Sequence, residues 1–520
     1  MLAPLRPDVY LRMAAAARQE VSSQTVGFAV AAQRCPDRPG LIDELGALTW
    51  RELHERCNAF GVALQAVAGD EKATVGIMCR NHRGFVEALV GAMRIGADVV
   101  LLNTSFAGPA LAEVVRREGI DVLVYDDEFD ESVTAALAEN PRLRQITAWT
   151  DKPLQSASTV EDLIAEHRGR RPRLPQRAGA LILLTSGTTG TPKGARRTSG
   201  DGAGALTAIL GGVPWRAEEV TVVVAPMFHA WGFFQLVFSA LMACTIVTRR
   251  RFDPEATLAM VDRHRATGLA IVPVMLDRIM ALPAAVRGRY DCTSLRFVAA
   301  SGSRMRPDVV TEFMDEYGDI VYNNYNATET GMVTIAKPAD LRAAPETAGR
   351  PVQGTDIRIL DDRGRPVPVG DVGQICVRNN TAFDGYSSGD TKGFLDGYMA
   401  SGDVGYTDSS GRLFVVGRDD EMIVSGGENV YPIEVEKLLL THSDVSDATV
   451  IGVEDAEFGQ RLVAFVVLEG NAATDAEGLK DFVRQNLANF KVPREIRVLD
   501  ELPRSSTGKI VRRELAALLG

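Results

Sequence analysis

The amino-acid sequence predicts an α/β protein with a large N-terminal domain of βαβ-type sheets, a β-rich subdomain and a small α+β C-terminal domain. Three observations support this fold class. Short apolar runs alternate with helical segments through the first half of the chain. Short strands separated by turns follow from Gly349, and the residues after Gly417 have their own pattern of helices and strands.

The first half of the chain has the alternation typical of parallel sheets covered by helices. We expect buried strands at 74–78, 98–102, 122–125 and 181–184, and helices at 85–95 and 131–139. The same rhythm continues through expected strands at 222–225, 269–272 and 296–300. The basic run Arg168–Arg173 (RGRRPR) is interpreted as a solvated linker.

The segment Val220–Val247 is apolar and long enough to span a bilayer. It contains Pro226, His229 and Gly232 near its middle, where a membrane helix would be uninterrupted. We therefore expect a strand, a turn and a buried helix. Peripheral contact with a membrane remains an open alternative.

In the second half, the pattern of alternating strands and helices ends at Gly349. Short strands separated by the turns DDRGRP and VGDVG run to Val377, and expected strands at 412–416 and 422–424 continue this β-rich part. Beyond it we expect helices at 433–440 and 476–488, and strands at 448–453, 462–468 and 495–498. The predicted organisation is a large domain at 1–417, a hinge at 418–422 and a small domain at 423–520.

Composition narrows the classes of partner. The 520 residues are 46% hydrophobic and 24% charged, and 57 Lys+Arg against 68 Asp+Glu give a net charge of -11. This balance argues against nucleic acid bound by bulk charge, whereas a few local cations are enough for ATP. The 6 cysteines show no CxxC spacing, and the N-terminal residues lack the pattern of a signal peptide. We expect a cytoplasmic protein without a zinc site.

The stretch LLTSGTTGTPKGA, residues 183–195, follows an expected strand and has the chemistry of an anion-binding loop. A Walker loop needs Ser or Thr directly after its lysine, but Gly194 follows Lys193 and Pro192 precedes it. The P-loop NTPase class is therefore excluded. Backbone N–H groups, hydroxyls and one charge are expected to hold phosphates, from Thr185, Ser186, Gly187, Thr188, Thr189, Gly190 and Lys193.

This loop resembles the STTSGTTGxPKG loop of the adenylate-forming superfamily, which includes fatty acyl-CoA synthetases and other AMP-dependent synthetases and ligases. The other motifs of that superfamily follow in order, from about Thr25 to about Leu515. The motif PMFHAWG, residues 226–232, resembles its fourth motif. The resemblance implies that His229 borders the acyl and pantetheine tunnels, although a buried histidine with satisfied hydrogen bonds fits equally. Apolar neighbours are expected to line the acyl pocket, namely Phe228, Trp231, Phe233, Phe234 and Met332.

The motif NNYNATE, residues 323–329, resembles the YGxTE motif. The resemblance implies that Tyr325 stacks on adenine, next to Asn324, that Thr328 contacts the α-phosphate and that Glu329 binds Mg²⁺. Asn326 stands where the superfamily usually has Gly, and we expect the turn to survive because Asn tolerates left-handed backbone angles.

The motif ASGS, residues 300–303, lies where GGAP is usual. Ser301 and Gly302 are therefore expected to contact adenine, although the serine departs from the pattern.

Four further motifs follow towards the C-terminus. ASGD (400–403), GR (417–418), the VSGGENVYPIE segment (424–434) and LPRSSTGKI (502–510) resemble later motifs. Asp403 is expected to bind the ribose hydroxyls and Arg418 the ribose or a phosphate. The resemblance also implies a hinge at Asp420, a pantetheine-lining loop at Gly426 and Gly427, and a catalytic lysine for adenylation at Lys509.

The resemblance implies an ATP-dependent acyl-CoA synthetase that uses Mg²⁺. It would join a carboxylic acid to AMP with release of pyrophosphate, and then transfer the acyl group to CoA. In the superfamily the small domain is mobile: it rotates so that the lysine leaves and the glycine loop arrives. The apolar residues near His229 favour a fatty or related apolar acid. An amino-acid substrate would require an early Asp, which residues 228–235 lack.

Three other functions stay open. An acyl-AMP ligase that loads a carrier protein has the same chemistry in its first step, but residues 331–349 contain no apparent insertion, which favours CoA. A light-emitting oxygenase shares the fold. A non-catalytic protein that binds a nucleotide or an acyl ligand is a different class, and the presence of Glu329, Asp403, Arg418 and Lys509 argues against it.

Overall fold

The computed structural model describes residues 5–68, 73–151, 158–185, 193–197, 210–361, 363–379, 382–387, 393–421, 423–425, 428–455, 459–470, 472–505 and 508–519. The chain divides into two compact units. The first contains residues 1–345, 352–354 and 379–392, and the second contains 346–351, 355–378 and 393–520. The predicted hinge at 418–422 stays a prediction.

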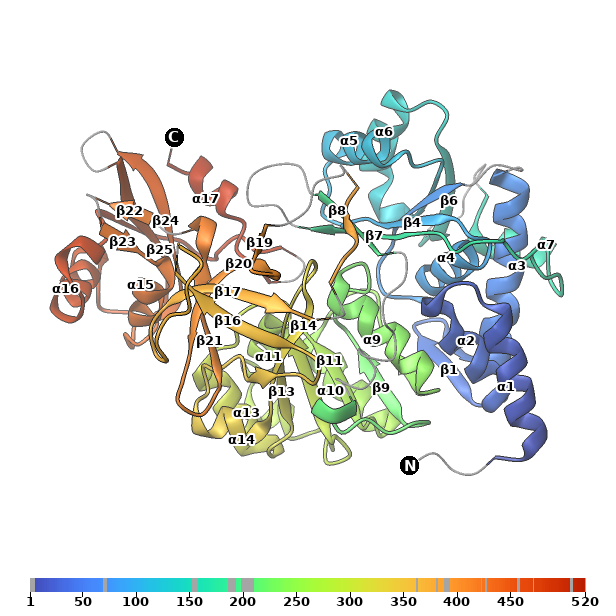
Figure 1. The fold of residues 1–520 in the computed structure, drawn as a ribbon, viewed down its shortest axis with the longest axis horizontal. Helices are drawn as coiled ribbons and strands as arrows, with labels where there is room; N and C mark the ends of the chain where they lie inside the picture. The colour runs from blue at the N-terminus through green and yellow to red at the C-terminus, as the bar shows by residue number, and fades with distance from the viewer. Residues whose placement is uncertain are drawn as a thin grey trace. The chain divides into compact units, whose positions relative to one another are not determined.

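The first unit contains a largely parallel sheet built from the expected βαβ pattern (Figure 1). Its strands run in the order β18 (Gly385–Tyr386), β8 (Lys193–Arg197), β7 (Leu181–Thr185), β4 (Asp98–Leu101), β3 (Thr74–Met78), β5 (Val122–Asp126) and β6 (Arg144–Trp149). The pairs from β7 through β6 are parallel, whereas β8 is antiparallel to both β7 and β18. The intervening helices are α3 (Trp50–Ala68), α4 (Arg83–Arg94), α5 (Gly108–Glu118), α6 (Asp130–Glu139) and α7 (Val160–Glu166), with a short 3-10 turn η1 (Asp127–Phe129).

A second sheet of this unit has parallel strands at its centre. Its order includes β14 (Gly331–Ala336), β13 (Val321–Ala327), β12 (Phe297–Ser301), β11 (Gly268–Ile271), β9 (Val220–Val223), β10 (Thr245–Val247), β1 (Pro39–Asp43) and β2 (Gly46–Thr49). Pairing is parallel from β13 through β1. The remaining helices of the unit are α1 (Pro7–Gln19), α2 (Ser23–Arg34), α9 (Ala230–Leu241), α10 (Pro254–His264), α11 (Pro273–Met280), α12 (Ala284–Arg287), α13 (Pro307–Tyr317) and α14 (Pro338–Ala343).

The segment 220–247 forms the expected strand, turn and helix. Residues of β9 and α9 belong to the buried apolar core. A Cβ atom on Gly232 would lie 2.2 Å from the carbonyl oxygen of Pro226, so only glycine lets the first turn of α9 approach the end of the preceding strand. Within the part of the chain that the structure describes, no helix has both the length and the apolar character needed to cross a membrane.

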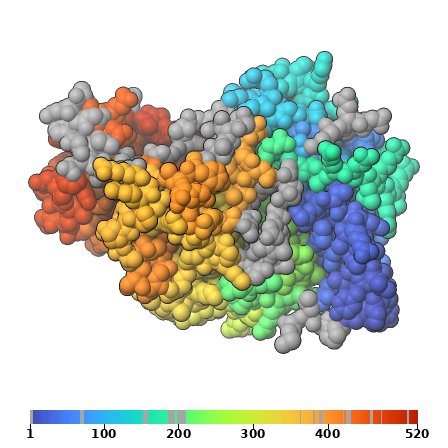
Figure 2. Space-filling model, viewed as in Figure 1, coloured from blue at the N-terminus to red at the C-terminus, as the bar shows by residue number. Residues whose placement is uncertain are grey.

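Helix α1 has no buried residue and contributes to the outer surface of the first unit (Figure 2). Helix α2 lies beneath it and packs closely on α9, because a Cβ atom on Gly27 would come within 2.5 Å of the Leu241 nitrogen. Arg12 of α1 is among the residues that line a polar pocket on this side of the unit.

The second unit contains two smaller sheets. One has the order β16 (Asp356–Leu360), β17 (Gly373–Arg378), β20 (Tyr398–Thr407) and β19 (Phe394–Leu395), with β21 (Leu413–Arg418) paired to β20. The other has the order β23 (Glu428–Val430), β22 (Ile423–Ser425), β25 (Gly459–Leu468) and β24 (Val445–Asp455), with β26 (Glu495–Val498) paired to β25. The remaining elements are β15 (Arg350–Pro351), η2 (Asp419–Glu421), α15 (Pro432–Leu439), α16 (Ala476–Asn486), η3 (Asn489–Lys491) and α17 (Arg512–Ala517). The predicted β-rich and α+β parts are both present.

Candidate active site

The predicted adenine contacts lie at the carboxyl ends of two neighbouring parallel strands. Ser301 ends β12 and is paired in register with Asn324 of β13. Both side chains are buried, and Nδ2 of Asn324 donates to the carbonyl oxygens of Ala300 and Tyr322 at 3.3 and 3.2 Å. Tyr325 follows, and it is only partly buried. Strand ends of this kind are where open α/β sheets bind ligands.

The two departures from the superfamily pattern contact each other. The hydroxyl of Ser301 donates to Oδ1 of Asn326 at 2.8 Å. We expected Asn326 to sustain a left-handed turn, but it lies within strand β13, where the pairing with β14 shifts between Tyr325 and Asn326. The strand bulges instead of turning, and Asn326 does not take a left-handed conformation, so the expectation of a left-handed turn is wrong.

Glu329, the predicted Mg²⁺ ligand, is held by a residue that the sequence did not single out. The hydroxyl of Tyr386 donates to Oε1 of Glu329 at 2.7 Å. The backbone N–H of Phe383 donates to the Glu329 carbonyl at 2.8 Å. Glu329 and its neighbour Thr328 are partly exposed. A carboxylate with one oxygen fixed by a hydroxyl can still offer oxygen to a hard cation, so the residues present fit Mg²⁺.

Tyr386 also connects Glu329 with the strand that follows the phosphate loop. Strand β18 pairs with β8, and Tyr386 lies opposite Ala195. Strand β8 begins at Lys193, which pairs with Thr185 at the end of β7. The backbone of this hairpin therefore fixes both ends of the predicted phosphate loop. The loop residues Ser186, Gly187, Thr188, Thr189 and Gly190 lie outside the described residues, as do the side chains of Thr185 and Lys193.

The predicted acyl-pocket residues surround the start of α9. His229 precedes the helix, is partly buried and has its ring 4.4 Å from that of Phe228. Trp231 donates its indole N–H to the carbonyl of Ile271 at 2.8 Å and stacks with Phe234. Phe233 is buried in a different apolar cluster from Trp231. Met332 is buried in β14. These contacts make the aromatic residues part of the core, and their role in binding an acyl group stays a prediction.

In the second unit, the two predicted ribose ligands face each other across adjacent strands. Asp403 of β20 and Arg418 of β21 are partners in the antiparallel register. Nη1 of Arg418 lies 3.4 Å from Oδ1 of Asp403, and the Asp403 N–H donates to the Ser401 hydroxyl at 3.1 Å. The antiparallel pairing of β20 with β21 thus brings together two residues that are not neighbours in the sequence.

Lys509, the predicted catalytic lysine, is exposed and lies in the second unit. The Ser505 N–H donates to the Lys509 carbonyl at 2.7 Å, and Gly508 takes a left-handed conformation with φ of +79°. The side chain of Asp420 lies outside the described residues, although its backbone is part of η2. Gly426 and Gly427 also lie outside the described residues.

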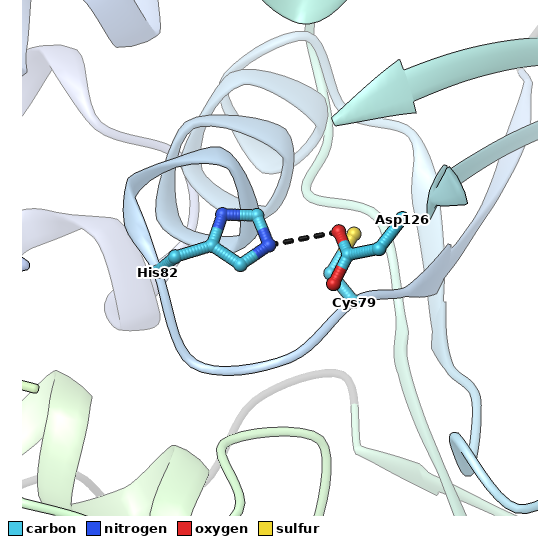
Figure 3. Close-up of side chains that lie close together, drawn as sticks. All are labelled: Cys79, His82 and Asp126. Atoms are coloured by element: carbon cyan, nitrogen blue, oxygen red, sulfur yellow. Dashed lines mark hydrogen bonds and ion pairs between the residues drawn. The ribbon is translucent and has the colours of Figure 1, made fainter. Parts of the chain in front are cut away.

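Three buried residues outside the predicted site form a cluster of potential metal ligands. Cys79, His82 and Asp126 are fully buried, and their ligand atoms lie within 4.8 Å of one another (Figure 3). The Gly84 N–H donates to Nδ1 of His82 at 3.0 Å, so the proton of the neutral ring is on Nε2, which lies 2.8 Å from Oδ1 of Asp126. A protonated nitrogen has no lone pair for a metal. Burial, and then the charge of Asp126, also raises the pKa of the Cys79 thiol well above its usual value. We interpret the cluster as an internal hydrogen-bonded support between β5 and α4.

Comparison with known proteins identifies the family. The profile of the AMP-binding enzyme family matches residues 28–387, and that of the AMP-binding enzyme C-terminal domain matches 434–509. The chain is 32% identical to a feruloyl-CoA synthase of Amycolatopsis over 91% of its length and 94% of the relative. It is 29% identical to the fatty acid–[acyl-carrier-protein] ligase ScoC of Streptomyces coeruleorubidus, over 95% of each chain.

Among solved structures, the fold is similar to o-succinylbenzoate CoA synthetase (MenE) from Bacillus subtilis in complex with its acyl-adenylate intermediate. The TM-score is 0.81 at 27% identity, covering 94% of this chain and 97% of that one. This chain therefore belongs to the AMP-binding enzyme family. The predicted superfamily and fold class are confirmed, and the matches bear out the predicted enzyme class of AMP-forming ligases.

Proposed function

We propose that this enzyme is an acyl-CoA synthetase. It activates an apolar carboxylic acid as an acyl adenylate with ATP, releases pyrophosphate, and transfers the acyl group to CoA. The observation that carries the proposal is the placement of Glu329. Tyr386 holds this carboxylate and, through β18, joins it to the strand that begins directly after the phosphate loop.

The chemistry requires groups that offset negative charge. A carboxylate attacks the α-phosphorus of ATP, so two anionic groups must approach each other. The phosphate-loop donors, Thr328 and Lys509 stabilise this charge, and Mg²⁺ held by Glu329 would supply further positive charge. Asp403 and Arg418, already paired in register, position the ribose, while the strand ends around Tyr325 hold the adenine.

The small domain supplies different groups in the two steps. Lys509 serves adenylation, whereas the loop containing Gly426 and Gly427 lines the path of the pantetheine arm during thioester formation. Asp420 is the hinge between these two states. This division explains how one site can perform both half-reactions, because adenylation takes place at the α-phosphorus and thioester formation at the carbonyl carbon, and each step needs its own residues near the reacting atoms.

The acid is an apolar aromatic or fatty carboxylic acid. The aromatic residues at the start of α9, including Trp231 and Phe234, support this choice. Relatives named for aromatic and fatty acids also support it. CoA is the preferred acceptor, and the similarity to ScoC makes a carrier protein the second candidate.

A carboxylate panel tests the proposal. We expect pyrophosphate exchange into ATP to depend on an added apolar acid, and the thioester of CoA to be detected by mass. Lys509→Ala should lower exchange by ~10²–10³, the usual effect of removing one charge-stabilising donor. It should still convert a supplied acyl adenylate and CoA into thioester.

Lys480→Ala is the matched control, because it removes a lysine from α16 of the same unit without touching a predicted site residue. Equal loss of both half-reactions in Lys509→Ala would contradict the proposed role of the lysine. Absence of exchange with every acid would support the non-catalytic alternative.

A further inference from the structure

A polar pocket lies in the first unit, among elements that carry no residue of the candidate active site. Its volume is about 520 Å³, and it is lined by side chains of α1, α2 and α3 and by the basic segment after α7. These helices lie side by side in Figure 1. A volume in this range suits a small organic molecule.

The lining is predominantly cationic. Four arginines line the pocket, and Glu55 is the one acidic residue among the lining residues. The arginines are Arg12, Arg51, Arg170 and Arg171. Arg12 and Arg51 are bridged to Asp8 and Asp37 at 2.8 and 3.0 Å. By contrast, Arg170 and Arg171 form no ion pair with any residue that the structure describes. The basic run interpreted above as a linker thus brings two unpaired guanidinium groups to the pocket.

Two neutral side chains of the lining, His54 and Asn58, are oriented by a buried arginine. Arg94 is 3% exposed and bonded to Glu20 at 2.9 Å. Its guanidinium also donates to Nδ1 of His54 at 2.9 Å and to Oδ1 of Asn58 at 3.0 Å. Because arginine only donates, the accepting atoms of both side chains must face it.

The donor atoms of these two side chains, Nε2 of His54 and Nδ2 of Asn58, are consequently available to a ligand in the pocket. Among the described residues, none accepts a hydrogen bond from Nδ2 of Asn58 or Nε2 of His54, and both residues line the pocket. Asn58 is only 7% exposed. Burial, and then the charges of Arg94 and Arg171, lower the pKa of His54 to about 3, so the ring stays a neutral donor at pH 7.

We propose that this pocket is a second binding site that takes a small molecule bearing a phosphate group. A phosphate has several acceptor oxygens, and two guanidinium groups and two neutral donors can each donate hydrogen bonds to them. Arginine is well suited to this role because its guanidinium group can bind two phosphate oxygens at once. Glu55 is placed to accept a hydrogen bond from a hydroxyl of the same ligand. The phosphate can belong to a soluble metabolite or to a lipid headgroup.

Glycerol 3-phosphate is the probe, since it represents both sources, and glycerol is its counterpart without phosphate. Calorimetric titration of the full chain at low salt, with saturating α,β-methylene-ATP, isolates binding outside the nucleotide site. We expect saturable binding of glycerol 3-phosphate and none of glycerol. Arg170→Ala/Arg171→Ala should weaken binding at least about tenfold.

Arg168→Ala/Arg173→Ala is the matched control, because it removes two charges from the same run at positions that do not line the pocket. It should leave binding within about twofold. Asn58→Asp keeps an oxygen for Arg94 but turns a carboxylate to the pocket, and it should abolish binding while the melting temperature shows that the fold is retained.

Vesicles of phosphatidic acid in phosphatidylcholine distinguish the two sources. Vesicle binding that depends on Arg170 and Arg171 identifies a lipid headgroup, whereas binding of the free compound alone identifies a soluble ligand. Binding of neither, or equal loss in the control variant, overturns the inference. Pyrophosphate exchange should be unchanged in Arg170→Ala/Arg171→Ala, so failure here leaves the proposed function standing.

Discussion

Tyr386→Phe tests whether the contact with Glu329 positions the metal-binding carboxylate. The substitution removes one hydroxyl and keeps the ring, which packs edge-on against Phe383 with centroids 4.9 Å apart. The lost hydrogen bond measures 2.7 Å and ends on a carboxylate. Hydrogen bonds to charged groups contribute about 1.5–3 kcal/mol. Since 1.4 kcal/mol is a factor of ten, we expect the affinity of the site for Mg²⁺ to fall about ten- to hundredfold.

The assay is pyrophosphate exchange into ATP, measured with an activating acid over a range of Mg²⁺ concentrations. We expect Tyr386→Phe to need more Mg²⁺ for half-maximal exchange, because Glu329 is then free to leave the orientation that binds the cation. The melting temperature should change little, which separates positioning from a general loss of structure.

Tyr290→Phe is the control, because it removes a similar tyrosine–glutamate bond, 2.8 Å to Glu255, at a distance from the predicted site residues in sequence. It should leave exchange and the Mg²⁺ requirement unchanged. An unchanged Mg²⁺ requirement in Tyr386→Phe would refute the reasoning, and so would an equal loss in both variants.

Three further results are expected. Burial lowers the pKa of His54 to about 3 in the folded protein, whereas in the unfolded chain the ring titrates near 6.5. The contribution of the neutral ring to stability is therefore present above pH 6.5 and is lost as the pH falls. His54→Gln removes this loss, so between pH 6 and 4 its unfolding free energy, measured by urea titration, should fall about 1.4 kcal/mol per pH unit less steeply than that of the parent protein. A double-mutant cycle of Ser301→Ala and Asn326→Gly should give a coupling of about 1 kcal/mol in ATP affinity, and additive effects would show that the pair does not act together. His82→Leu should lower the unfolding free energy by about 3 kcal/mol, because it removes the ring from the buried Asp126 carboxylate and leaves it the Arg80 N–H. Intact stability would contradict the interpretation of the cluster.

Much of the fold follows from local patterns. The expected strands at 74–78 and 495–498 match β3 and β26 at both ends, because each has an apolar pattern bounded by turn residues. The expected strand at 222–225 begins two residues late relative to β9, which starts at Val220. Boundaries shift in this way because pairing with a neighbouring strand, rather than the strand's own residues, decides where it starts.

The sequence by itself determined the βαβ organisation, the family and the order of the motifs, because side-chain periodicity and short motifs are local properties of the chain. Only the tertiary structure decided which distant residues meet. The pairing of Asp403 with Arg418 depends on strand register. The hydrogen bond from Tyr386 to Glu329 depends on how β18 lies beside the residues between β13 and β14. The orientation of His54 and Asn58 depends on a buried arginine from another helix. Such contacts are set by packing between segments far apart in sequence, and no local pattern encodes them.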